Sequence, residues 1–96
     1  MHAVIGRVRI KPERADEARS MIAEHGVAML HGMTGSSHGY WARSIDNGDI
    51  TQHSFWLFDT EENALAAQAT FESLRDLPDA PATLLGVDVC EVIGQT

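Results

Sequence analysis

The chain has 96 residues, of which 44% are hydrophobic and 22% charged, and 14 acidic against 7 basic side chains give it a formal net charge of −7. This length predicts one domain over residues 1–96, and the apolar content excludes a disordered chain. The acidic charge excludes nucleic acid and an anionic membrane as expected partners, because a negative surface repels polyanions. The apolar runs are too short to span a membrane, and residues 1–7 lack a signal-peptide pattern, so we expect a cytoplasmic protein.

The first third of the chain predicts a strand followed by a helix. Residues 2–10 alternate between two faces, as a half-buried strand does. Pro12 ends this strand and suits the first turn of a helix, where its missing N–H costs nothing. Spacings of three and four predict that the buried stripe of the helix is Ala15, Ala18, Ile22, His25 and Met29. His25 is therefore expected to face the sheet.

The middle of the chain predicts a β-hairpin. Two β-rich runs, residues 39–45 and 50–58, are joined through Asn47-Gly48, which suits a type I′ turn because both turn positions need positive φ. This turn would pair Tyr40 with Phe55 and Trp41 with Ser54. One face of the hairpin would then carry Trp41, Arg43, Gln52, Ser54, Trp56 and Phe58, and the other Tyr40, Phe55 and Leu57.

The last third predicts a second helix and a fourth strand. Asp59 or Thr60 is the expected N-cap, acids follow in the first turn, and Leu77-Pro78 is the expected end. Residues 84–93 alternate as a final strand. The order β-α-β-β-α-β, with right-handed crossovers, predicts an α+β ferredoxin-like fold: a four-stranded antiparallel sheet with both helices on one face.

The sheet face turned away from the helices predicts association. It would carry either Tyr40 and Phe55 or Trp41 and Trp56, depending on which way the hairpin is turned. Either set is too apolar to stay in water on a soluble monomer. We therefore expect a homodimer, in which two such sheets close into an α/β barrel.

The segment Ser-Phe-Trp-Leu-Phe-Asp-Thr-Glu-Glu-Asn-Ala at residues 54–64, together with the closing strand 89–93, resembles the antibiotic biosynthesis monooxygenase family of dimeric α/β barrels. The resemblance implies a homodimer with a pocket between sheet and helices. In some members it also implies cofactor-independent oxygenation of an electron-rich aromatic substrate. The family's pocket aromatic matches Phe58, which favours the helix side for Trp41 and Trp56.

The candidate site combines flat apolar surface with a few polar groups. Two indoles beside polar side chains suit a flat organic ligand, and the expected binding residues are Trp41, Gln52, Ser54, Trp56 and Phe58. His25 is the candidate general base, since histidine titrates near neutral pH. Arg43 or Gln52 would stabilise the resulting anion. The alternative for each of these residues is ordinary packing, or a histidine at the rim.

The sequence predicts neither a metal nor a cofactor. No histidine pair has the close helical spacing of a zinc site, and one cysteine, Cys90, adds little. Haem-degrading relatives of the family use a histidine on the second helix and an asparagine on the first strand. Here the last histidine is His53 and residues 2–10 contain no asparagine, so haem degradation ranks third.

Two functions rank ahead of haem degradation. The first is a small-molecule-binding dimeric barrel that acts as a cofactor-independent monooxygenase on an aromatic or polyketide-like substrate. The second is a non-enzymatic, stress-associated dimer whose interior is filled by its own side chains. A cavity with a polar base between helices and sheet favours the first, and a packed interior favours the second.

Overall fold

The computed structural model describes residues 1–44, 50–76 and 79–96, and its four strands form one sheet. The strands are β1 (His2–Ile10), β2 (Ser36–Arg43), β3 (Ile50–Phe58) and β4 (Ala82–Glu91). Their order is β2-β3-β1-β4, and each neighbouring pair is antiparallel. The predicted ferredoxin-like architecture is therefore confirmed. The expected Asn47-Gly48 turn and the expected helix end at Leu77-Pro78 lie outside the described residues.

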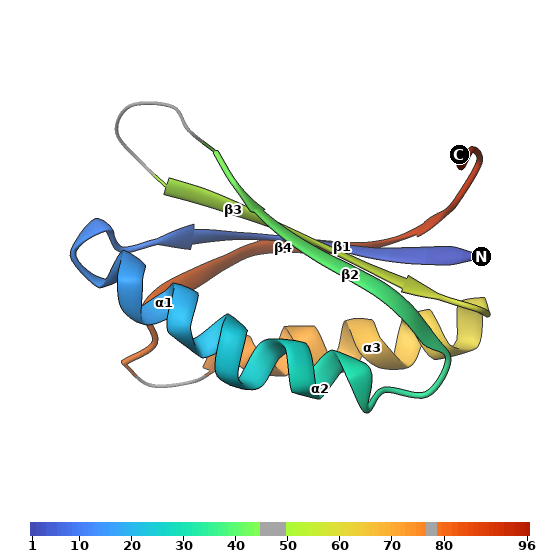
Figure 1. Cartoon of the computed structure of the whole chain (residues 1–96), viewed down its shortest axis with the longest axis horizontal. Helices are drawn as coiled ribbons and strands as arrows, with labels where there is room; N and C mark the ends of the chain where they lie inside the picture. The colour runs from blue at the N-terminus through green and yellow to red at the C-terminus, as the bar shows by residue number, and fades with distance from the viewer. Residues whose placement is uncertain (45–49, 77–78) are drawn as a thin grey trace.

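The helices cover one face of this sheet (Figure 1). The first crossover consists of a 3-10 turn (Pro12–Arg14), α1 (Ala15–Met21), a π-helical turn (Ile22–Gly26) and α2 (Val27–His31). The second consists of α3 (Glu61–Ser73) and a 3-10 turn (Leu74–Asp76). No helix in the described ranges is long and apolar enough to cross a membrane.

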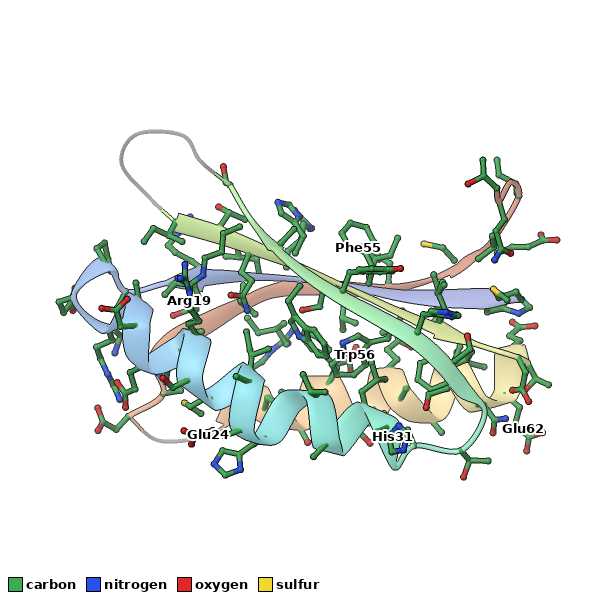
Figure 2. All side chains as sticks on the ribbon, in the orientation of Figure 1. Arg19, Glu24, His31, Phe55, Trp56 and Glu62 are labelled. Carbon is green, nitrogen blue, oxygen red and sulfur yellow. The ribbon has the colours of Figure 1, made fainter. Side chains whose placement is uncertain are left out.

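The hairpin register follows the sequence prediction. Tyr40 pairs with Phe55, and Trp41 pairs with Ser54. The two alternatives for the hairpin are also resolved, because Trp56 is 2% exposed among the helices whereas Phe55 is 38% exposed on the other side. Figure 2 shows these two side chains pointing to opposite sides of the sheet. The tryptophan face of the hairpin is therefore the helix side.

The π-helical turn changes which residues of the first crossover are buried. A π turn is wider than an α turn, so it adds a residue and shifts the inward positions along the chain. After Ile22, the positions nearest the sheet are Gly26 and Leu30, and Leu30 is 5% exposed. The prediction that His25 faces the sheet is wrong, because its side chain is 77% exposed.

The core lies between the helices and the central strands. Val4 and Phe58 are completely buried there, and Phe71 of α3 packs over β1. A Cβ added at Gly6 would overlap the ring of Phe71, so a glycine is what allows this close approach of helix and sheet. The Thr60 side chain caps α3 by accepting a hydrogen bond from the Asn63 backbone N–H at 3.2 Å, as one of the two expected caps.

Candidate functional site

A cavity of about 280 Å³ lies between the helices and the sheet, and its lining includes Phe71 of α3 and Leu74 of the 3-10 turn that follows. On the sheet side, the cavity lining includes residues of three strands: Val8, Ile10, Trp41, Gln52, Ser54 and Trp56. The first crossover contributes Ala18, Met21, Ile22, His25, Gly26 and Met29. The lining is therefore mostly apolar, with a few polar groups on the hairpin, as is typical of sites for small organic ligands.

The two indoles form one wall of the cavity. The ring centroids of Trp41 and Trp56 are 6.2 Å apart at an interplanar angle of 64°, an edge-to-face arrangement. Trp56 also lies 4.9 Å from the ring of Phe71 on α3. Gly26 lies against Trp41, since a Cβ there would stand 3.7 Å from the indole, an ordinary contact distance. Strand alternation places both tryptophans on the helix side, and the π-helical turn brings Gly26 to meet one of them.

The polar part of the lining comes from β3. Gln52 is 6% exposed and Ser54 is 3% exposed, so both are buried although their side chains are polar. They lie two residues apart and therefore share one face of the strand. The structure brings both together with Trp41 and Trp56, as the sequence predicted for this group.

Arg43 does not line the cavity, but it forms a hydrogen bond with Gln52, which does. Its Nε donates a hydrogen bond to Gln52 Oε1 at 3.1 Å, and its Nη2 donates to the Ala15 carbonyl oxygen at 2.7 Å. These two bonds tie the end of β2 to β3 and to the start of α1. Two of the five N–H groups of this guanidinium are thus engaged by the protein itself.

The remaining candidate residues do not join this group. His25 borders the cavity, but its exposed side chain lies 4.0 Å from the Glu24 carboxylate, measured from Nε2 to Oε2. Phe58 is completely buried in the core and does not line the cavity. His25 is nevertheless the titratable side chain that the described lining contains.

A segment that sequence reasoning missed closes one end of the cavity. Ala80 and Pro81, just before β4, and Ala82, the first residue of β4, contribute to the lining. Arg14 holds this segment, since its Nη1 donates to the Asp79 carbonyl oxygen at 2.8 Å. Pro81 could have signalled a fixed turn, but nothing in the sequence showed that it would face the ligand space.

The same arginine forms a salt bridge that shifts two pKa values. Arg14 Nε donates to Glu17 Oε2 at 2.6 Å, one turn further along the helix. This hydrogen bond lowers the pKa of the Glu17 carboxyl and raises the pKa of the Arg14 guanidinium further above its usual range. Both groups therefore stay charged at neutral pH and anchor the start of the first crossover.

A second hollow lies on the other side of the first crossover. It is an open groove beside β2 that includes Arg19, Val27, Tyr40 and Arg43, and it shares Trp41 and Gln52 with the cavity. Within the described ranges, no three His, Cys, Asp or Glu side chains are grouped as metal ligands would be. The cavity is lined by both indoles together with Gln52 and Ser54, whereas the groove includes only one of the indoles, so the cavity is the stronger candidate site.

Comparison with known proteins supports the fold and leaves the family open. No model of a known protein family matches the sequence, and no curated protein matches it. Among solved structures, the chain is similar to a mutant of MhuD crystallised with two manganese protoporphyrin IX molecules bound per active site. The TM-score is 0.68 with 13% sequence identity, over 100% of this chain and 98% of that chain. At this identity, the likeness establishes a shared fold over the whole chain.

Proposed function

We propose that this chain binds a flat aromatic small molecule in the cavity, and that it oxygenates such a molecule without a bound cofactor. The observation that carries the proposal is the cavity itself: about 280 Å³, walled by two indoles and floored by Gln52 and Ser54. Indole faces provide apolar contact area for a planar ligand, and the buried polar groups orient it. A cavity of this kind also favours ligand binding over the alternative of an interior filled by its own side chains.

The oxygenation step is one that such a cavity can support with few groups. A base removes a proton from an activated methylene of the substrate, and the carbanion forms a C–O bond with dioxygen. After protonation of the peroxide, loss of the second C–H proton breaks the O–O bond and expels hydroxide. The net change converts CH₂ and O₂ into a carbonyl group and water. The substrate supplies all the electrons that reduce dioxygen, so the step needs no other reductant.

The chain's own residues would contribute binding, polarity and one base. The apolar walls exclude water from the carbanion, which would otherwise be reprotonated. His25 is the candidate base because it is the titratable side chain in the described lining, and its exposed side chain would have to turn toward the cavity to reach a substrate. Arg43 would act through Gln52, the residue that it contacts.

We further propose that two chains pair through the open face, defined as Ile5, Tyr40, Phe55 and Leu57. Tyr40, Phe55 and Ile5 lie side by side across three strands, because Tyr40 pairs with Phe55 and Phe55 pairs with Ile5. Tyr40 is 62% exposed on this face. A large exposed ring beside other apolar side chains is unusual on a monomer and indicates an interaction surface. Burial of this face against a second copy would form the barrel that the sequence resemblance implies.

A haem group is a poor match to this cavity. Haem iron needs an axial side-chain ligand such as histidine. The α3 side of the core presents Phe71, and the described residues of α3 include no histidine. His25 at the cavity mouth is directed to solvent. We therefore assign no step to haem, and we propose that the protein works without it.

A thermal-shift screen followed by an oxygen-uptake assay tests the proposal. Planar phenols, quinols and anthrone are the first compounds, and at least one should raise the melting temperature by a few degrees at saturation. Anthrone should then consume oxygen and give anthraquinone in the presence of a chelator. His25→Ala should slow this turnover, whereas the matched control His31→Ala should not. If no planar compound raises the melting temperature, the binding function is wrong; if binding occurs without oxygen uptake, only the oxygenase step is wrong.

A further inference from the structure

The hydrogen bond between Arg43 and Gln52 fixes which end of the glutamine amide is free. An arginine guanidinium can only donate hydrogen bonds, so the amide atom facing it must be the carbonyl oxygen. Arg43 is itself held by the Ala15 carbonyl oxygen at 2.7 Å, and its Nε meets Gln52 Oε1 at 3.1 Å. The NH₂ group of Gln52 therefore lies at the end of the amide away from Arg43.

This NH₂ group belongs to a residue that lines the cavity, and it makes no hydrogen bond within the described part of the chain. Gln52 is 6% exposed, and the described residues provide no hydrogen bond to its Nε2. Ser54, two residues further on the same face and 3% exposed, also makes no side-chain hydrogen bond in the described part of the chain. Both residues line the cavity. Two neighbouring polar groups that line an apolar cavity and have no partner in the described part of the chain are available to a ligand, so they indicate which ligand groups the cavity can bind.

We infer that the cavity selects ligands carrying an acceptor oxygen, which Gln52 Nε2 binds as donor with the Ser54 hydroxyl as its neighbour. The inference rests on the proposed ligand-binding function and names its chemical class: planar aryl ketones, quinones and phenolates. Arg43 is a positioning residue in this scheme. It holds the amide in the donor orientation, and its positive charge behind the amide favours an oxygen on which negative charge develops.

The charge distribution around the site supports an acceptor and disfavours a donor ligand. The described lining contains no carboxylate, so an amine or ammonium group would find no acidic partner there. Arg43 lies directly behind Gln52, and Arg19 borders the adjacent groove. These two basic side chains lie near the site in a chain whose net charge is −7. An oxygen that becomes anionic during deprotonation of the ligand would meet a favourable environment.

A pair of shape-matched probes tests the inference. 2-Acetylnaphthalene and 2-ethylnaphthalene share ring and size, but the first carries a carbonyl oxygen that the second lacks. Wild-type protein should bind the ketone about tenfold more tightly, because the ketone accepts a hydrogen bond from a cavity-lining donor that the bound hydrocarbon would leave unpaired. Dissociation constants of both probes are measured by calorimetry on the full chain, and their ratio is the readout.

Variants of Gln52 and Arg43 test whether these two residues cause the preference for the ketone. Gln52→Glu keeps the size of the side chain and its contact with Arg43 but replaces the donor with an acceptor, so the ratio should fall to about one or below. Arg43→Met frees the amide to turn and should lower the ratio. Arg43→Lys, which supplies another donor-only partner, should restore most of it. In wild-type protein, the side-chain amide NMR signal of Gln52 should move with the ketone alone, while that of Gln68 stays fixed as a control.

Each outcome bears on one proposition. Equal affinity for the two probes, or a Gln52 amide signal that ignores the ketone, overturns the inference while leaving the ligand-binding function intact. Binding of neither probe, nor of any compound in the planar panel, overturns the ligand-binding function itself. An unchanged ratio in Arg43→Met shows that Arg43 does not position the amide. The NMR measurement uses wild-type protein, so it decides the question even where a variant fails to fold.

Discussion

Phe55 and Trp56 are adjacent in β3 and face opposite sides of the sheet, one 38% exposed and the other 2% exposed (Figure 2). A strand alternates its side chains, so one short run of sequence supplies both faces. Trp56 belongs to the wall of the cavity, and Phe55 belongs to the open face proposed for pairing. Substitutions at the two positions should therefore separate association from ligand binding.

Phe55→Asp should weaken dimerisation. The change places a charge in the middle of the open face, where pairing would bury it at a cost of several kcal/mol. We expect the dimer dissociation constant to rise about a hundredfold or more. Sedimentation equilibrium over a concentration series measures it. Leu65→Asp is the matched control, since Leu65 is 47% exposed on α3 and lies on the helix side. A wild-type protein that remains monomeric at all concentrations would contradict the pairing of open faces.

Gly6→Ala should destabilise the fold. The added Cβ would overlap the ring of Phe71, so α3 and β1 would have to move apart. Overpacking of this kind costs about 1–3 kcal/mol of unfolding free energy. Urea denaturation measures the difference. Gly94→Ala is the control, because no atom lies within 4 Å of a Cβ at that position and its stability should stay unchanged. Equal stability of the two variants would show that α3 does not approach β1 so closely.

Glu17→Gln should alter the acid side of the stability profile. Arg14 lowers the folded-state pKa of Glu17, so the contribution of this carboxylate is present above its unfolded pKa of about 4.3 and is lost as the pH falls through the lower folded value. The melting temperature of the variant should be below that of the wild type at pH 7, and the difference should shrink as the pH falls below 4.3. The difference is small because the pair is solvent-screened. A difference that grows toward low pH would contradict the assigned salt bridge.

The fold could be predicted because its main signals are local. Alternating runs, Pro12 at a helix start and Asn47-Gly48 between two β-rich runs each follow from the preferences of a few residues. The register that they implied holds where it can be checked, at Tyr40 with Phe55 and Trp41 with Ser54. The same register places Trp41, Gln52, Ser54 and Trp56 on one face. Most of the hairpin wall of the site was thus available from the sequence.

The rest of the site depends on features that a periodic pattern cannot show. The π-helical turn at Ile22–Gly26 brings Gly26 toward the sheet, and the side chain of His25 is exposed where an α-helical pattern predicted burial. Arg43 was expected to meet the ligand, but its bonds to Gln52 and Ala15 depend on tertiary contacts between β2, β3 and α1. The contribution of Ala80 and Pro81 depends on tertiary contacts with the start of the first crossover, where Lys11 N–H donates to the Pro81 carbonyl oxygen, and no local signal encodes these contacts.

Hemin should not form a stoichiometric complex with this protein. The described part of α3 carries no histidine, and His25 is exposed at the cavity mouth, so no buried histidine of the described lining is placed as an axial ligand for the iron. A titration followed by absorbance should show neither a sharp Soret shift nor an endpoint at one hemin per chain. If a sharp endpoint is found, His25→Ala identifies whether this histidine is the ligand.

A fluorescence titration with 2-acetylnaphthalene tests the central claim, that the cavity beside the two tryptophans binds a planar aromatic molecule. Trp41 and Trp56 are the two tryptophans of the chain, and both line the cavity. Their emission should be quenched saturably, with one ligand per chain. Ala18→Leu, which fills the cavity from the first crossover, should abolish this quenching, while the exposed-site control Ala28→Leu should keep it. Quenching that rises linearly without saturation, or that is equal in both variants, would contradict a ligand site in this cavity.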